Sequence, residues 1–236
     1  MRHIGITCSY VDWPTEERLY LRLCRYIEAL GDAGARGEPL WLPSHGDLSR
    51  WAEHLSFRLD GLVISGGADL PPPLYGEEPR ADANLDIVTP ARPDFESALL
   101  GAFIEKRKPV LGICYGCQFL NIWHGGSLIQ DIPTLWPNPI RHDNNVLHCV
   151  CLERDSKLHR IIGMDEFEVC SQHHQAIARV AEEGRVTAWA PDHSPEGLEF
   201  REAPFLLGVQ WHPERTRESL ATQRLFGALV AACSDS

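Results

Sequence analysis

The stretch of residues 108–126, KPVLGICYGCQFLNIWHGG, decides how this chain folds. Residues 109–113 form a short apolar run of the kind that makes a fully buried strand. The run leads into Gly112-Ile113-Cys114-Tyr115-Gly116, where two glycines flank a nucleophile and cysteine takes the usual place of serine. Apolar residues within 119–123 then have the spacing of a buried helical face. The stretch therefore predicts a sharp strand-to-helix turn with Cys114 at its tip.

Cys114 would lie at the N-terminus of the predicted helix, where the helix dipole favours a thiolate over a thiol. Gly112 and Gly116 would let two backbones pass closely at a point where a Cβ atom would clash. Most free cysteines are small buried apolar residues, and that alternative applies to Cys114 as well. The two glycines, the strand before them and the helix after them favour a nucleophile.

Size and composition describe an ordinary globular protein of 236 residues, which we expect to form a single domain. Charged residues make up 23% of the chain and hydrophobic residues 44%. The net charge of −11 repels phosphate backbones, which argues against nucleic acid as a partner. No apolar run approaches the roughly 20 residues that span a bilayer, and the N-terminus does not resemble a signal peptide. We therefore expect a cytoplasmic protein without a membrane partner.

The cysteines are even in number, which invites a disulfide interpretation. However, the chain is long for a disulfide scaffold, and several of the cysteines lie in apolar segments that resemble strands. We expect reduced thiols at all eight positions, which are Cys8, Cys24, Cys114, Cys117, Cys149, Cys151, Cys170 and Cys233.

The order of the predicted elements indicates an α/β fold. The first half alternates strands at 3–7, 38–42, 60–65 and 109–113 with helices at 15–30, 48–59 and 92–107. The second half is rich in strands, at 148–152, 167–170, 186–190, 198–200 and 205–210, and closes with a helix at 217–232. This order predicts a mostly parallel central sheet flanked by helices, with antiparallel strand additions. The polar, proline-rich residues 70–89 are predicted to form a surface loop beside a substrate cleft.

Two further motifs follow predicted strands. In Ser65-Gly66-Gly67-Ala68-Asp69, the glycine pair would point backbone N–H groups outward, where they can hold an anion or a developing oxyanion. In His212-Pro213-Glu214, the histidine comes at a strand end, which is where open α/β sheets place ligand sites, and Glu214 can orient its ring. Taken singly, a glycine pair more often marks an ordinary tight turn, and His-Pro-Glu is equally compatible with a capped turn before the final helix.

Together, the three motifs resemble those of the class I glutamine amidotransferase-like superfamily, and the resemblance covers nearly the whole chain. Within it, the chain is most similar to the γ-glutamyl-γ-aminobutyrate hydrolase-like (peptidase C26) family. The segments that carry this similarity are residues 73–77 (PLYGE), 120–121 with 125–131 (LN, GGSLIQD) and 171–176 (SQHHQA). The resemblance implies a flavodoxin-like fold and a hydrolase that uses a cysteine nucleophile.

The resemblance also implies a role for each matching residue. Cys114 would be the nucleophile, His212 the base and then the acid, and Glu214 the group that orients His212. The backbone N–H groups of Gly67 and Tyr115 would form an oxyanion hole. The glutamyl amino and carboxylate end would be held by Gln118, Ser171, Gln172, His173 and His174. The enzyme would attack a small-molecule γ-glutamyl amide, release the amine and hydrolyse a γ-glutamyl thioester, and we expect no cofactor or metal ion.

Two departures from the family pattern leave alternatives open. Tyr115 stands where the hydrolase branch usually has arginine, which leaves the released amine unidentified; the negative net charge mildly favours a cationic amine. Cys117 creates Cys114-x-x-Cys117, which is compatible with a redox dithiol, although a dithiol would not explain His212 and Glu214.

Other functional classes compete with a self-contained hydrolase. One is a glutaminase subunit that delivers ammonia to a separate synthetase, and another is a binding protein on the same scaffold. A zinc site built from Cys149-x-Cys151 and histidines is a weaker alternative, because no second ligand pair has metal-site spacing. The oligomeric state stays open, with a homodimer among the options.

Overall fold

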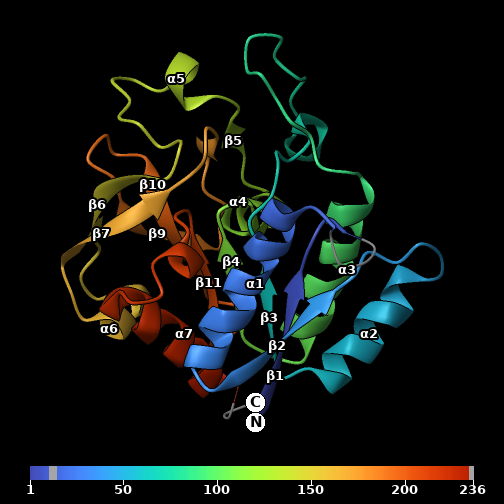
Figure 1. The fold of residues 1–236 in the computed structure, drawn as a ribbon. Coiled ribbons are helices and arrows are strands. Elements are labelled where there is room, and N and C mark those ends of the chain that lie inside the picture. Colours follow the sequence, from blue (N-terminus) through green and yellow to red (C-terminus); the bar gives the residue numbers. More distant parts are fainter. Residues whose placement is uncertain (11–14, 234–236) are drawn as a thin grey trace.

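The computed structural model describes residues 1–10 and 15–233. Its centre is one nine-stranded sheet with the order β2-β1-β3-β4-β11-β10-β9-β6-β7 (Figure 1). The parallel half consists of β1 (Arg2–Thr7), β2 (Ala35–Leu40), β3 (Gly61–Ile64), β4 (Val110–Ile113) and β11 (Leu206–Val209). The antiparallel half consists of β6 (Val146–Leu152), β7 (Glu166–Ser171), β9 (Gly184–Trp189) and β10 (Pro195–Phe200). This architecture confirms the predicted α/β fold with antiparallel additions.

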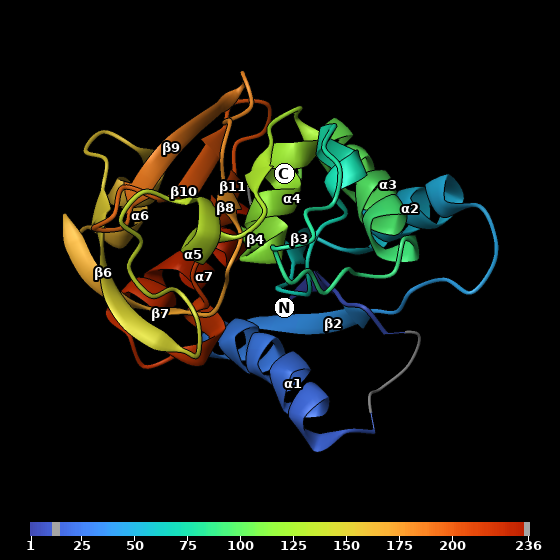
Figure 2. The same ribbon diagram turned by 90° about the horizontal axis from the view of Figure 1, so that it is seen from above.

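Helices cover both faces of the parallel half, because alternate side chains of each strand point to opposite faces. Val63 of β3 belongs to one apolar cluster, whereas Leu62 and Ile64 belong to the other. The first cluster includes side chains of α1 (Glu17–Asp32), α6 (Lys157–Ile162) and α7 (Leu220–Ala232). The second includes side chains of α2 (Leu48–Arg58), α3 (Ala91–Glu105) and α4 (Tyr115–Trp123). Figure 2 shows α1 on one side of the parallel strands and α3 and α4 on the other.

Residues 70–89 do not form a purely exposed loop. They contain a short 3₁₀ helix, η1 (Pro72–Tyr75), and a bridge between Asp69 and Ile87 ties the segment to the strand end before it. Five of its side chains are buried, those of Leu70, Pro72, Tyr75, Ala83 and Val88. Further along, a second small sheet pairs β5 (Leu128–Ile129) with β8 (Ala176–Ile177), and α5 (Ile132–Leu135) follows β5. The bridge from Asp69 to Ile87 fixes residues 70–89 beside the carboxyl end of β3.

The sheet order brings the three sequence motifs together. Strands β3, β4 and β11 are parallel neighbours, so their carboxyl ends meet at the same edge of the sheet. Ser65 follows β3, Cys114 follows β4, and His212 comes three residues after β11. All eight cysteines are free. Within the described residues, no helix has both the length and the apolar character needed to cross a bilayer.

Candidate active site

Cys114 forms the turn between β4 and α4 in a strained conformation. Its φ of 53° lies in the left-handed region that residues other than glycine rarely adopt. A Cβ atom on Gly116 would lie 2.0 Å from the Ile64 carbonyl oxygen, and one on Gly112 would lie 2.5 Å from the Gly116 oxygen. Both glycines are therefore required for β3, β4 and α4 to approach this closely. The turn has the predicted form, and Cys114 lines a cavity of about 580 Å³.

His212 and Glu214 form a buried pair beside Cys114. His212 Nδ1 donates to Glu214 Oε1 at 2.7 Å, and the backbone N–H of His212 donates to the Cys170 oxygen at 2.9 Å. Burial alone would lower the pKa of His212, but the Glu214 carboxylate and the Cys114 sulfur raise it to about 9. Burial would raise the pKa of Glu214, yet the charge of His212 brings it below its ordinary value. This electrostatic balance favours an imidazolium at His212 that is paired with the Glu214 carboxylate.

Two backbone donors near Cys114 are free. Among residues 1–10 and 15–233, no acceptor takes the N–H of Gly67 or that of Tyr115, the first residue of α4. The neighbouring Gly66 N–H, by contrast, donates to the Tyr26 hydroxyl at 3.0 Å. Free N–H groups at a strand-to-helix turn are suited to hold a developing oxyanion.

Known proteins resemble this chain over most of its length. The family model of peptidase C26 matches residues 3–214. The chain belongs to the peptidase C26 family. The family model and the relatives below support a hydrolase or amidotransferase-like enzyme.

Two relatives and one solved structure illustrate the similarity. Protein NtpR of Enterococcus hirae is 35% identical over 207 residues, which cover 83% of each chain. The γ-glutamyl-γ-aminobutyrate hydrolase PuuD of Escherichia coli K12 is 33% identical over 224 residues, or 89% of this chain and 85% of PuuD. The glutaminase domain of a CTPS from Trypanosoma brucei superposes with a TM-score of 0.67 at 15% identity, covering 100% of this chain and 95% of the other. The solved structure shows the shared fold.

In this peptidase C26 protein, Tyr115 belongs to a buried network behind the glycine turn. The side chain of Arg92 is 1% exposed and donates to the backbone oxygens of Ser65 at 2.8 Å and Gly66 at 3.3 Å. Glu96 accepts from Arg92 Nε at 3.0 Å and from the Tyr115 hydroxyl at 2.7 Å. Arg92 also stacks 4.0 Å above the Tyr115 ring. Arg92 thus holds the two carbonyl groups that directly precede Gly67.

The sequence analysis missed Arg92 and Glu96. Their spacing of four residues on the predicted helix 92–107 was the available signal, because residues four apart share a helix face. Nothing in that spacing shows that the pair is buried beneath the glycine turn, however.

The cavity has a volume of about 580 Å³, and the expected substrate-binding residues take different positions around it. Gln118, Gln172 and His174 line the cavity, and Gln118 Nε2 donates to the Gln175 oxygen and to Gln210 Oε1, both at 3.2 Å. Ser171 does not line it, because its hydroxyl donates to the His142 oxygen at 2.9 Å.

The two adjacent histidines point in opposite directions. His174 is bonded at 3.0 Å to both Asp69 and Asp131. The hydrogen bond to Asp69, with that to Asp131, raises the pKa of His174 to about 9, so both ring nitrogens can donate. His173 also lines the cavity, but its Nε2 lies 3.4 Å from Glu196 Oε1.

The exposed Arg18, Arg22 and Arg25 line the cavity from α1, at a helical spacing that the sequence shows but that was not recognised. Cys117 is buried in the second apolar cluster, whereas Cys114 belongs to the first, and burial raises the pKa of the Cys117 thiol well above its ordinary value. A buried thiol with a raised pKa gives little support to a redox dithiol.

Proposed function

We propose that the chain is a self-contained hydrolase of γ-glutamyl amides that uses Cys114 as its nucleophile. The observation that carries this proposal is the buried His212–Glu214 pair beside Cys114, with the pKa of His212 raised to about 9. An imidazolium in this position keeps the thiolate charged and holds a proton ready for the leaving amine.

The reaction would proceed in two stages. The Cys114 Sγ would attack the γ-carbonyl carbon, and the N–H groups of Gly67 and Tyr115 would stabilise the oxyanion. Collapse of this tetrahedral intermediate would break the C–N bond as His212 gives its proton to the departing amine, leaving a γ-glutamyl thioester. Water would then attack the thioester with His212 as the base, which releases glutamate and restores the thiolate. Glu214 would stabilise the imidazolium throughout.

Local charge supports a leaving amine that carries a carboxylate, such as γ-aminobutyrate. Arg18, Arg22 and Arg25 line the cavity, and none of them forms an ion pair with an acidic group among residues 1–10 and 15–233. Four acidic residues also line it, of which three are paired, Asp69 with His174, Asp143 with Arg141 and Glu214 with His212, and only Asp86 has no ion pair within the described residues. The cavity therefore has a cationic wall despite the negative net charge. The similarity to a relative named for γ-glutamyl-γ-aminobutyrate also favours a leaving amine that carries a carboxylate. Gln118, Gln172 and His174 would hold the glutamyl end.

The test is amine release by the purified chain, assayed with γ-glutamyl-γ-aminobutyrate, γ-glutamylputrescine and glutamine. We expect turnover of the first substrate, loss of at least about a thousandfold in Cys114→Ala, and unchanged turnover in Cys151→Ala, which removes an exposed thiol. A folded wild-type chain that turns over none of the three substrates would overturn the proposal and favour a glutaminase subunit that needs its synthetase.

A further inference from the structure

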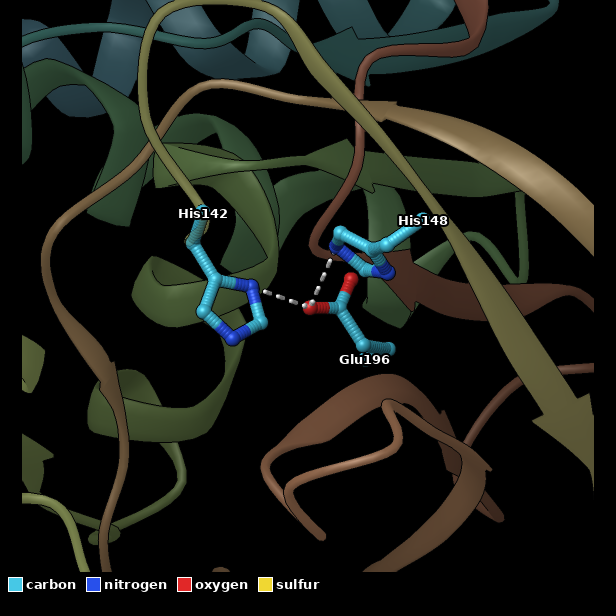
Figure 3. A group of neighbouring side chains, drawn as sticks. All are labelled: His142, His148 and Glu196. Carbon is cyan, nitrogen blue, oxygen red and sulfur yellow. Dashed lines mark ion pairs between the residues drawn. The ribbon is translucent and has the colours of Figure 1, made fainter. Parts of the chain in front are cut away.

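Four side chains outside the catalytic pair converge in the antiparallel half of the protein. His142, His148, His173 and Glu196 form what we call the histidine–glutamate cluster. Glu196 Oε1 lies 3.3 Å from His142 Nδ1, 3.4 Å from His173 Nε2 and 3.8 Å from His148 Nε2. Figure 3 shows the rings of His142 and His148 directed at the Glu196 carboxylate. One ligand atom from each of these three residues lies within 4.8 Å of the others.

The cluster is buried and joins three separate parts of the chain. Its side chains are between 0% and 7% exposed. His142 precedes β6 and His148 lies within it, His173 follows β7, and Glu196 lies in β10. Buried ionisable groups are rare unless they are paired or bound to a cation, so four of them at one point need an explanation.

The hydrogen bonds of the histidines fix which ring nitrogen carries the proton. His142 Nε2 donates to Asp192 Oδ2 at 3.0 Å, His148 Nδ1 to the Cys149 oxygen at 3.0 Å, and His173 Nδ1 to the Gln175 oxygen at 2.9 Å. Carboxylate and carbonyl oxygens only accept, so each of these nitrogens is the donor. In a neutral imidazole, the other nitrogen then carries a lone pair. All three of those nitrogens face Glu196.

In the cluster, hydrogen-bond acceptors therefore face one another: the three lone-pair nitrogens and the Glu196 carboxylate. Among the described residues, the three facing nitrogens and both oxygens of Glu196 have no hydrogen-bond partner. Acceptors that meet in a buried site repel one another, and each unsatisfied group costs free energy. One proton on His142 would give one donor and would leave His148 and His173 unsatisfied. A single dication would satisfy all four groups at once.

We propose that the histidine–glutamate cluster is a structural site for one Zn²⁺ ion. Tetrahedral zinc with ligand bonds of about 2.0 to 2.2 Å places neighbouring ligand atoms roughly 3.3 to 3.6 Å apart, close to the three distances to Glu196. Three imidazoles and a carboxylate suit zinc, whereas calcium and magnesium prefer oxygen ligands. The second N–H of each histidine donates to a carboxylate or a carbonyl, as is usual for zinc-bound histidine. His142, His148 and Glu196 would supply three ligands, and His173, which meets the group through Glu196, would supply the fourth of a closed structural site.

This site differs from both metal expectations drawn from the sequence, which were no metal ion or a site using Cys149 and Cys151. Cys151 is exposed, and neither cysteine belongs to the cluster. The ligand residues are spread over residues 142–196 without a short metal-binding motif. Only the pairing of β6, β7, β9 and β10 brings them together.

The ion would hold one wall of the catalytic cavity in place. His173 lies between Gln172, whose carbonyl oxygen is 3.9 Å from Cys114 Sγ, and His174, which lines the cavity. The Glu196 carbonyl oxygen accepts from the Gln210 N–H at 2.8 Å, and Gln210 accepts from Gln118. The ion would thus fix the cavity wall without touching the reacting atoms.

The test uses the full chain, purified without a histidine tag. Elemental analysis of the purified protein should find close to one zinc per chain. After removal by a chelator, added Zn²⁺ should raise the Tm by roughly 5 to 15 °C. Co²⁺ added in place of zinc should give the strong visible absorption of a four-coordinate site. These readouts do not depend on hydrolase activity, so they stand even if the proposed reaction is wrong.

Variants separate the cluster from other binding sites. His148→Ala and Glu196→Gln should lose the bound zinc and the shift in Tm, whereas His45→Ala, which removes an exposed histidine, should keep both. A folded wild-type chain that binds neither Zn²⁺ nor Co²⁺ at micromolar concentration, with an unchanged Tm, would overturn the proposal. That measurement is made on the wild type and does not require the variants to fold.

Discussion

The Tyr115 hydroxyl donates to Glu96 across 2.7 Å, so the residue next to Cys114 is fixed from beneath by helix α3. The same carboxylate binds Arg92, which in turn binds the backbone oxygens of Ser65 and Gly66. The two backbone donors proposed for the oxyanion hole thus share one buried support. Their relative position depends on this support as well as on the turns that carry them.

Arg92→Lys tests this support. Lysine keeps the charge but cannot bind Glu96, Ser65 and Gly66 at once, because only arginine has a planar fork of donors. We expect kcat to fall about 10- to 100-fold with a smaller change in KM, since misplaced donors weaken transition-state binding most. Steady-state kinetics, combined with urea unfolding to show that the variant is folded, provide the measurement. An unchanged kcat would mean that the glycine turn holds its shape without Arg92.

The raised pKa of His212 predicts how the reaction and the stability depend on pH. Acylation should slow as the pH rises through about 9, because His212 then loses the proton that the leaving amine needs. The protonated pair should also stabilise the folded state fully below about pH 6.5, the ordinary pKa of histidine, and this contribution should be lost as the pH rises toward 9. Single-turnover rates and urea unfolding at several pH values measure the two effects.

His212→Gln serves as the control for the pH effects. The variant should be nearly inactive, and the pH dependence of its unfolding free energy between pH 6.5 and 9 should be shallower than that of the wild type. An equal slope in both proteins would assign the pH dependence of stability to other groups.

Arg22→Gln tests the cationic wall of the cavity. For γ-glutamyl-γ-aminobutyrate, KM should rise about twofold to tenfold at an unchanged kcat, because the guanidinium is exposed and screened. For γ-glutamylputrescine, KM should stay constant or fall. Arg50→Gln, which changes an exposed arginine on α2 outside the cavity, should affect neither substrate. Equal effects on the anionic and cationic substrates would show that Arg22 does not contact the leaving amine.

Gly116→Ala tests the close approach at the Cys114 turn. The new Cβ would lie 2.0 Å from the Ile64 oxygen, which is backbone and cannot move aside, so we expect a loss of about 3 kcal/mol or more in unfolding free energy. Gly227→Ala in α7 is the matched control. It meets nothing within 4 Å and should stabilise the protein by about 0.5 to 1 kcal/mol. Urea unfolding compares the two, and a mild effect at Gly116 would contradict the close approach.

The elements of the parallel half could be predicted because their signals are local. A buried strand, a glycine turn and an apolar helical stripe are each contained in about 20 residues, as in β4, the Cys114 turn and α4. Strand β2 was predicted at 38–42 but runs over Ala35–Leu40, because pairing with β1 from Arg2 to Thr7 decides its start. Helix α6 was not predicted, because its six residues hold too few apolar positions to show a helical period.

The site was predictable to the extent that it follows from strand ends. Cys114 and His212 lie at the ends of parallel neighbours, so topology alone brings their backbones together. The contacts of Arg92 with Ser65, and of Glu196 with three histidines, depend on side chains that meet through tertiary packing and strand register. No short motif encodes such contacts, because the partners lie far apart in the chain.

The position of β11 sets when the proposed nucleophile, Cys114, could become functional during synthesis. This strand inserts between β4 and β10 at the centre of the sheet, although it is the last strand in sequence order. Cys114 leaves the ribosome long before residues 206–212 do, and until then it has neither its base nor a neighbouring strand on that side. A nascent chain that ends before β11 would therefore carry an inert thiol and an unpaired edge on β4. Assembly of the sheet and onset of catalysis would then be one late folding event.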